Sequence, residues 1–191
     1  MKRFGTPAFD LKLPKTVYIV GSGPSVLDHY KRIPEDAYVI ALNGAINLPD
    51  LKTDLWFAHC QRNVEQEWWE ETYQNHKGPK FFGSFITELG YPSDYGFDWS
   101  DLRLFRIQSG ITVAGLAVQF ALLLGAQNII VVGLDMGGNV RYDGIENPKN
   151  SEEKWEKTVI LFNRVMKTLK QTFPTYSIYS LGPTKLDVIQ L

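Results

Sequence analysis

Short apolar segments alternate along this chain with longer segments in which apolar and polar residues are mixed. The short segments are rich in β-branched and aromatic residues and are predicted as strands; they are residues 16–20, 37–42, 54–59, 80–83, 102–107, 128–133 and 176–181. The mixed segments are predicted as helices; they are residues 26–33, 64–76, 113–124 and 151–172. This alternation predicts an α/β fold: a single Rossmann-like, doubly wound, mainly parallel sheet with helices on both faces.

Three further segments lie outside these elements. Residues 1–15 mix charges and prolines and are predicted as an N-terminal arm, so that the folded domain spans residues 16–191. Residues 84–100 and 136–150 are rich in glycine and polar residues and are predicted as loops. Both exceed the usual length of a connection, and loops of that length are often functional.

The loop that follows the first predicted strand has the composition of a phosphate-binding turn. Its residues are Gly21, Ser22, Gly23, Pro24 and Ser25. The glycines permit a sharp turn and close approach of a ligand to the backbone, and proline suits the first turn of a helix. Free N–H groups and the helix dipole then favour an anion at this position. The alternative is a tight turn in which glycine serves geometry alone.

Polar residues also follow other predicted strands, and ligands of doubly wound sheets bind beyond the carboxyl ends of the strands. Asn43 follows the second strand, where its amide could bind a base, a ribose or a phosphate, or could only form a turn. A second anion site is predicted before the helix of residues 113–124, although helix capping by Ser109 is the alternative. Its residues are Gln108, Ser109, Gly110 and Thr112.

Asp135 ends the most apolar strand and is the predicted metal ligand, because a carboxylate can hold Mg²⁺ together with substrate phosphates. Sugar binding and capping of the next turn are its alternatives. Residues 136–150 are predicted to form a mobile lid, within which Arg141 and Tyr142 would reach a phosphate or a sugar. Asp135, Arg141 and Tyr142 are therefore the predicted catalytic residues.

Composition narrows the class of protein. The chain has 191 residues and a net charge of −1, which gives no general attraction to nucleic acid or to anionic lipid. Its single cysteine, Cys60, excludes an internal disulfide framework and favours the cytoplasm. The longest apolar stretch, residues 113–124, is too short to span a bilayer, so no transmembrane segment is expected. The expected partner is a small molecule, and an oligomer is compatible with the sequence.

Three of these motifs together resemble two related families. The Gly-Ser-Gly-Pro-Ser loop at residues 21–25 is similar to the Gly-x-Gly-Pro-Ser loop of bacterial sialyltransferases that use CMP-sialic acid, and of archaeal-type 6-hydroxymethylpterin diphosphokinase-like proteins. Asn43 resembles the asparagine that contacts the nucleotide in the sialyltransferases. Ser109-Gly110 and the Ile-Ile-Val-Val-Gly-Leu-Asp segment ending at Asp135 resemble a block found in both families. Residues 53–57 are closer to the diphosphokinase-like proteins.

The resemblance implies a Rossmann-like nucleotide-binding domain, with donor phosphates near residues 21–25 and near Ser109-Gly110. Tyr142 corresponds to tyrosines that hold the donor phosphate in the sialyltransferases. Those enzymes have a catalytic histidine in the lid, whereas residues 142–157 contain no histidine. The favoured prediction is a glycosyltransferase-like enzyme with a nucleotide-sugar donor of the CMP type and an unknown acceptor. The alternatives are a diphosphokinase that uses ATP and Mg²⁺, and a nucleotide- or glycan-binding protein without catalysis.

Overall fold

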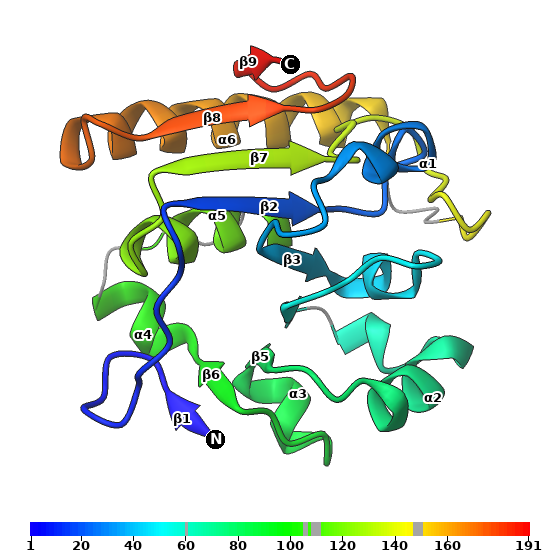
Figure 1. Ribbon diagram of the computed structural model, residues 1–191, viewed down its shortest axis with the longest axis vertical. Coiled ribbons are helices and arrows are strands. Elements are labelled where there is room, and N and C mark those ends of the chain that lie inside the picture. Colours follow the sequence, from blue (N-terminus) through cyan, green and yellow to red (C-terminus); the bar gives the residue numbers. More distant parts are fainter. Residues whose placement is uncertain (60, 105–106, 108–111, 147–150) are drawn as a thin grey trace.

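A parallel β-sheet forms the centre of the computed structural model, which describes the chain except for residues 60, 105–106, 108–111 and 147–150. In the described residues the sheet has nine strands, and all neighbouring strands run parallel. Their order across the sheet is β1 (Lys2–Arg3), β6 (Tyr95–Phe97), β5 (Lys80–Gly83), β4 (Leu55–Ala58), β3 (Val39–Leu42), β2 (Thr16–Val20), β7 (Asn128–Val132), β8 (Ser177–Ser180) and β9 (Ile189–Gln190) (Figure 1).

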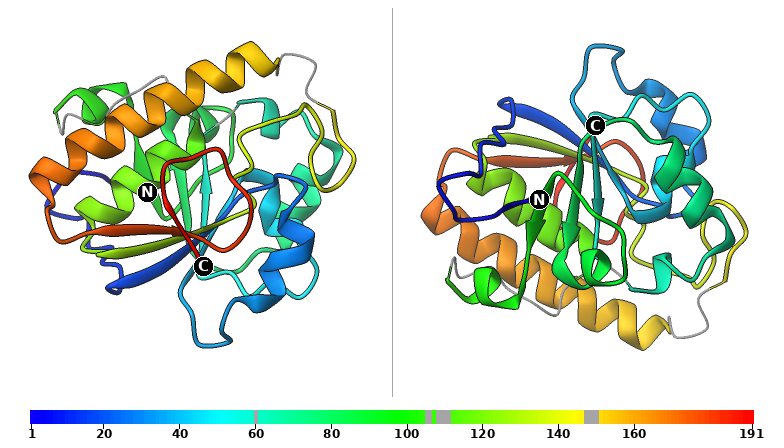
Figure 2. Two further views of the ribbon diagram at one scale, coloured as in Figure 1. Left: turned by 90° about the horizontal axis from the view of Figure 1, so that it is seen from above. Right: turned by 90° about the horizontal axis from the view of Figure 1, so that it is seen from below.

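Helices cover both faces of this sheet, as predicted (Figure 2). One face packs against α5 (Val113–Leu123) and α6 (Glu152–Thr172), through a core that includes Val17, Phe57 and Phe120. The other face packs against shorter helices, which are α1 (Val26–His29), η1 (Tyr30–Arg32), η2 (Asn43–Asn47), α2 (Glu67–Asn75) and α3 (Ser84–Glu88). The doubly wound α/β fold expected from the sequence is therefore confirmed.

Side chains along β4 point alternately to the two faces of the sheet, so this strand contributes to two hydrophobic cores. Leu55 and Phe57 lie in the core under α5 and α6, whereas Trp56 and Ala58 lie in the core under α2 and α3. All four side chains are buried, because a strand in the middle of a parallel sheet has no solvent face. This is why the strands of this chain are short apolar runs without polar alternation.

The predicted strand at residues 102–107 is wrong, because residues 99–104 form helix α4 (Trp99–Leu104). Asp98 caps this helix, since its carboxylate accepts hydrogen bonds from the backbone N–H groups of Ser100, at 2.7 Å, and Asp101, at 3.0 Å. Asp101 in return accepts from the Asp98 N–H at 2.9 Å. This reciprocal pair is a capping box, which is a stronger local signal than the apolar residues that follow it.

Two other boundaries also differ from the prediction. Residues 84–100, predicted as one loop, contain α3 and β6 as well as the start of α4. The helix predicted at residues 26–33 is divided into the single turn α1 and the 3-10 turn η1. Pro34 lies just beyond η1, so the chain has room there for only two turns. A third 3-10 turn, η3 (Gln61–Asn63), follows β4.

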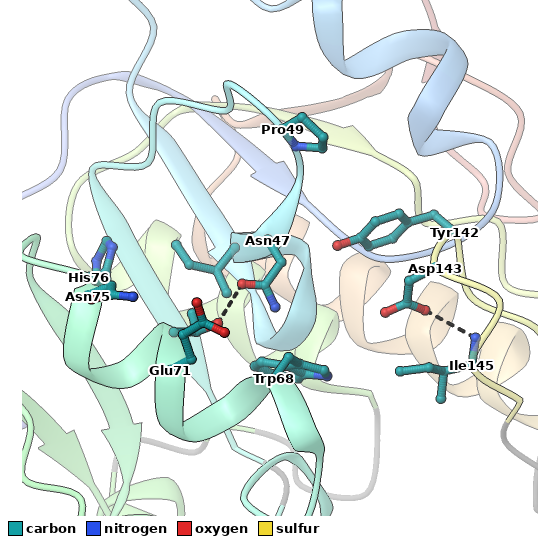
Figure 3. A pocket seen from close by; sticks show the side chains of 11 residues that line it. Asn47, Pro49, Trp68, Glu71, Asn75, His76, Tyr142, Asp143 and Ile145 are labelled. Carbon is teal, nitrogen blue, oxygen red and sulfur yellow. Dashed lines mark hydrogen bonds between the residues drawn. The ribbon is translucent and has the colours of Figure 1, made fainter.

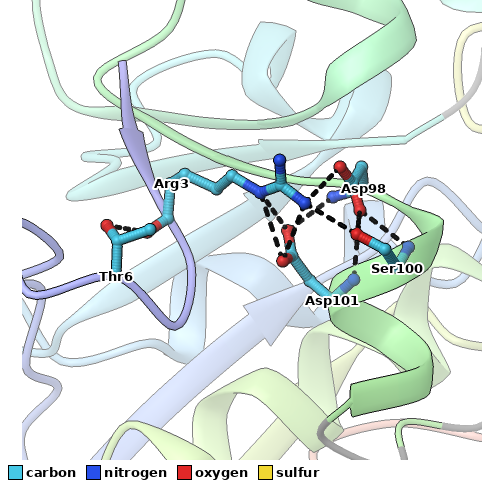
Figure 4. Close-up of polar contacts among 5 residues, drawn as sticks. All are labelled: Arg3, Thr6, Asp98, Ser100 and Asp101. Atoms are coloured by element: carbon cyan, nitrogen blue, oxygen red, sulfur yellow. Dashed lines mark hydrogen bonds and ion pairs between the residues drawn. The ribbon is translucent and has the colours of Figure 1, made fainter.

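Residues before β2 have more structure than a loose arm. β1 pairs with β6, and Phe4 is buried against Phe9 and Phe120. Arg3 reaches the capping box of α4, where it pairs with Asp98 at 2.5 Å and Asp101 at 3.2 Å (Figure 4). These contacts fix one edge of the sheet.

The order of the strands defines a topological switch point between β2 and β7. From β2 the chain adds β3, β4, β5 and β6 on one side, and it then returns through α5 to place β7 on the other side of β2. In open α/β sheets, ligands bind in the crevice outside the carboxyl ends of the strands at this reversal. The loops that follow β2, β3 and β7 therefore delimit the candidate site.

Candidate functional site at the switch point

The loop after β2 is fastened to the loop after β7. Gly21 donates its backbone N–H to the Val132 oxygen at 2.8 Å, and Gly23 donates to the Gly133 oxygen at 2.9 Å. A side chain on Gly23 would have its Cβ 2.5 Å from a carboxylate oxygen of Asp135 and 2.7 Å from the Gly133 oxygen. The two loops thus lie so close together that glycine is required by internal packing, whatever else the turn binds.

Asp135 lies at the start of α1 and contacts Ser25 twice. Its Oδ2 accepts the backbone N–H of Ser25 at 3.0 Å, and its Oδ1 accepts the Ser25 hydroxyl in a short hydrogen bond. The carboxylate therefore occupies part of the position where the sequence predicts a phosphate, since a helix start attracts either anion. Predictions for residues 21–25 as nucleotide ligands stay predictions.

The described residues give no support to the predicted metal site at Asp135. Both of its carboxylate oxygens already accept hydrogen bonds from Ser25. Across the described part of the chain, no three side chains of the His, Cys, Asp or Glu type converge to hold a cation. Asp135 as a magnesium ligand therefore stays a prediction.

Asn43 follows β3 with a left-handed backbone, at φ 49°, which asparagine tolerates better than most residues. Its side-chain oxygen accepts a hydrogen bond from the Asn63 amide at 2.7 Å, and its backbone oxygen accepts from the Trp56 indole at 2.9 Å. Asn63 is buried and thereby fixes which way the Asn43 amide faces. The Asn43 NH₂ group is left available as a hydrogen-bond donor.

Residues 140–146 form a short hairpin that lies across the ends of β2 and β3. An antiparallel bridge joins Val140 to Glu146, and the Arg141 N–H donates to the Ile145 oxygen at 3.0 Å. Tyr142 attaches the hairpin to both loops: its N–H donates to the Ser22 oxygen at 3.1 Å and its hydroxyl donates to the Gly44 oxygen at 3.0 Å. Burial raises the pKa of the Tyr142 phenol to about 12, so this donor stays protonated at neutral pH.

Arg141 lies beneath η2. Its guanidinium pairs with Asp143 at 2.7 Å, contacts the backbone at Gly44, and lies 5.7 Å from the centre of the Trp68 ring. The lid expected at residues 136–150 is thus, over residues 140–146, a docked hairpin in this structure. Whether it opens is untested and stays a prediction, and residues 147–150 lie outside the described residues.

Thr112 is the N-cap of α5, and its hydroxyl accepts the Gly115 N–H at 3.4 Å. Gln108, Ser109 and Gly110 lie outside the described residues, so the second predicted anion site has only this one described member. This contact supports helix capping, rather than anion binding, as the role of Thr112.

A pocket of about 740 Å³ opens beside this crevice, and sequence reasoning did not predict it (Figure 3). It lies between η2, α2 and the hairpin, and Tyr142 forms the wall that it shares with the crevice. The residues that line it are Ile46, Asn47, Pro49, Trp68, Glu71, Thr72, Asn75, His76, Tyr142, Asp143 and Ile145. Trp68 lies three or four residues before Glu71 and Thr72, and Asn75 lies three or four residues after them, which places all four on one face of α2. This spacing is the feature of the sequence that could have indicated the pocket.

Neither a family model nor a curated protein sequence matches this chain. Solved structures do match it. The sialyltransferase CstII from Campylobacter jejuni in complex with CMP matches at a TM-score of 0.60 and 20% identity, over 93% of this chain and 84% of that one. The same enzyme in complex with CMP-3FNeuAc matches at 0.62 and 20% identity, over 93% and 86%.

A second enzyme of that organism, the monofunctional α-2,3-sialyltransferase Cst-I, matches at a TM-score of 0.55 and 16% identity, over 90% of this chain and 78% of that one. At such identities the comparison shows the fold alone. These matches agree with the sialyltransferase half of the resemblance, and they give no support to the diphosphokinase-like half.

Proposed function

We propose that this protein is a glycosyltransferase-like enzyme that binds a nucleotide-sugar donor at the crevice between β2 and β7. The observation that supports it most directly is the convergence of the loops after β2, β3 and β7 at the switch point of the fold. Two of the matched structures that share this fold contain CMP or a CMP-sugar analogue, which makes a CMP-type donor the first candidate.

In this proposal the Asn43 amide donates a hydrogen bond to the donor, and Asn63 holds it in the required orientation. Backbone N–H groups of residues 108–112 would complete the phosphate site, because they precede α5. The hairpin would place the Tyr142 phenol and the Arg141 guanidinium beside the leaving phosphate, where a positive charge and a hydrogen-bond donor stabilise developing charge. Proximity of donor and acceptor would supply the rest of the rate enhancement. No step is assigned to Mg²⁺, because the described residues form no cluster of three or more potential metal ligands.

A binding protein without turnover is the second candidate. The observation that favours it is the absence of histidine from residues 142–157, where the resembled sialyltransferases have a catalytic one. With one cysteine in the chain, we place either form of the protein in the reducing cytoplasm.

Calorimetric titration with CMP, UDP, GDP and ATP tests the donor site, and an Asn43→Asp variant tests its location. Aspartate tolerates the backbone of residue 43 and keeps the oxygen that Asn63 contacts, but it loses the NH₂ donor. We expect CMP affinity to fall at least tenfold, which is about 1.4 kcal/mol. Asn128→Asp is the matched control. Asn128 is the first residue of β7 and so lies at the amino-terminal ends of the strands, away from the proposed donor site.

Unchanged CMP affinity in Asn43→Asp, or no nucleotide bound by the parent protein at millimolar concentration, would overturn the proposed donor site. Release of CMP from a CMP-sugar, measured with and without a mixture of glycan acceptors, separates the two candidates. Release above the uncatalysed rate establishes the enzyme, and tight binding without release establishes the binding protein.

A further inference from the structure

The pocket beside the donor crevice has the side chains of a sugar site, and Tyr142 is the one predicted site residue in its described lining. Its lining combines aromatic rings, side-chain amides and carboxylates around about 740 Å³, a volume within the range of small-molecule sites. We propose that this pocket is the acceptor subsite and that it takes a neutral pyranose. This inference rests on the proposed function and adds to it the class of acceptor.

Trp68 provides the apolar surface. Its ring lines the pocket between Glu71 of α2 and Ile145 of the hairpin, as Figure 3 shows, and the Arg141 guanidinium lies over the same ring at 5.7 Å from its centre. Arg141 and the neighbouring Trp69 ring hold the indole in place, so it loses little conformational freedom when a ligand binds. The C–H face of a pyranose packs on such a ring.

Polar groups suited to hydroxyls surround this surface. The Thr72 hydroxyl donates to the Asn47 oxygen at 2.7 Å, which fixes the amide and leaves the Asn47 NH₂ group as a donor. Glu71 and Asn75 extend from the same face of α2 toward the pocket (Figure 3). Amides and carboxylates together can both donate to and accept from the vicinal hydroxyls of a sugar.

Charge decides between a neutral and an anionic sugar. The described residues that line the pocket include two carboxylates, Glu71 and Asp143. They include no lysine or arginine. Arg141 neutralises Asp143 from outside the lining, at 2.7 Å, and Glu71 has no ion pair in the described part of the chain. Burial and Lys80 lower the pKa of His76, which keeps that ring uncharged at neutral pH. A sugar carboxylate would therefore meet the unpaired charge of Glu71, while the nearby cation, Arg141, lies outside the lining and is already paired with Asp143.

The location also fits an acceptor. Tyr142 contacts the loop after β2 through its backbone and lines the pocket with its side chain, so the pocket and the donor crevice share one wall. A sugar hydroxyl at this wall would lie next to the donor bound at the switch point. Two neighbouring sites with a common wall are the arrangement that a transfer between two bound molecules needs.

Ligand-observed NMR with simple glycosides tests the pocket without any donor. The probes are the methyl glycosides of glucose and galactose and their uronates, which have the same rings with a carboxylate at C6. We expect the parent protein to bind a neutral glycoside more tightly than its uronate, and Trp68→Ala to reduce that affinity at least tenfold. Trp68→Phe keeps an aromatic face and should retain most of the affinity for the neutral glycoside. Glu71→Gln should narrow the difference between neutral and anionic probes, whereas Glu67→Gln, on the same helix but outside the pocket, should not.

CMP affinity is measured on the same variants and separates this inference from the proposed function. If CMP binds but no neutral glycoside does, or if the uronates bind better, the acceptor assignment is wrong and the donor site stands. A tenfold loss of CMP affinity in Trp68→Ala would make the pocket part of the donor site and would also overturn the inference. If glycosides bind in the pocket and no nucleotide binds anywhere, the sugar site stands and the transferase function fails.

Discussion

Asp135 is the residue that joins the two loops of the switch point. Its carboxylate accepts from both the backbone and the hydroxyl of Ser25, across the gap between β2 and β7. An asparagine has one acceptor oxygen and no charge, so it can satisfy only one of these two donors well.

We therefore expect Asp135→Asn to lower the free energy of unfolding by about 1–3 kcal/mol, the usual range for a lost hydrogen bond to a charged group. Urea denaturation followed by circular dichroism measures it. Asp36→Asn is the control, because Asp36 is exposed and belongs to the turn before β3. Equal stability of the two variants would mean that Asp135 does not hold the loops together.

His59 follows β4 and is largely enclosed by Phe85 and Phe97, with ring centres 5.0 Å away in each case. Burial lowers the pKa of His59 to about 4, from an ordinary value near 6.5. Because the folded pKa is depressed, the neutral ring favours the fold above pH 6.5, and this stability is lost as the pH falls toward 4.

NMR titration of the histidine ring protons tests this assignment. We expect the His59 signal, identified by its absence from a His59→Gln variant, to stay in the neutral position from pH 7 down to pH 5. The unfolded protein in urea should titrate at the ordinary value. A midpoint near 6.5 in the folded protein would show that the ring is more accessible than its surroundings indicate.

Among the residues that the sequence predicts for the site, those that follow a strand end lie together at the switch point. Gly21, Gly23, Asn43 and Asp135 each come within three residues of the end of a short apolar run, and the sheet brings these ends together. Sequence reasoning could not find Trp68, because a tryptophan in an amphipathic helix faces a core or a pocket with the same spacing. The choice depends on η2 and the hairpin, which approach α2 only in the folded chain.

At the scale of elements, α4 shows where the hydrophobic pattern fails. Residues 102–107 contain alternating apolar residues and were therefore predicted as a strand, but Asp98 and Asp101 cap a helix one turn earlier. The start of α6 was predicted correctly because Ser151 caps it with its own side chain, which accepts the Lys154 N–H at 3.2 Å. Capping residues therefore gave better boundaries than apolar residues did.

The hairpin at residues 140–146 depends on the absence of a side chain at Gly44. A Cβ at this position would overlap the Arg141 guanidinium, and the three nearest atoms all belong to that flexible side chain. We expect Gly44→Ala to leave the fold intact, to displace Arg141 from Trp68, and to loosen the hairpin.

Limited proteolysis with trypsin measures this effect, because Arg141 is itself a cleavage site. Cleavage after Arg141 should be several times faster in Gly44→Ala than in the parent protein, since local opening exposes the bond. Cleavage after Arg103, in α4, is the internal control and should be unchanged. Equal rates at Arg141 would show that other contacts, such as the Tyr142 hydrogen bonds, hold the hairpin alone.

At the scale of the whole molecule, two basic residues near the N-terminus, Lys2 and Arg3, differ in what their ion pairs hold together. Arg3 joins β1 to α4 through Asp98 and through Asp101, whose side chain is only 7% exposed. Lys2 pairs with Asp10 on the surface, where both side chains are about half exposed. An exposed pair adds little stability, whereas removal of one partner leaves a buried carboxylate without its cation.

Arg3→Ala is therefore expected to lower the free energy of unfolding by about 1–3 kcal/mol, and Lys2→Ala by less than about 1 kcal/mol. Thermal and urea unfolding of both variants measure the difference. High salt should leave the Arg3 effect largely in place and remove what remains of the Lys2 effect. Similar losses in the two variants would contradict a special role for the buried pair.

The described part of the chain contains no helix that combines the length and the apolar character of a membrane span. Its longest helix, α6, has charged residues along its exposed side and buries Phe162, Val165 and Met166 against the sheet.

The pairing of β1 with β6 also affects how the chain reaches its native state. Lys2 lies opposite Tyr95, so β1 has no strand partner until β6 has been synthesised. The loop that must close between them is long, and such non-local pairings form slowly. During synthesis β2 can already pair with β3, while β1 is still unpaired and Phe4 is still exposed. The edge of the sheet beside α4 is thus expected to be completed late in folding, and Phe4 stays accessible to chaperones until β6 has been synthesised.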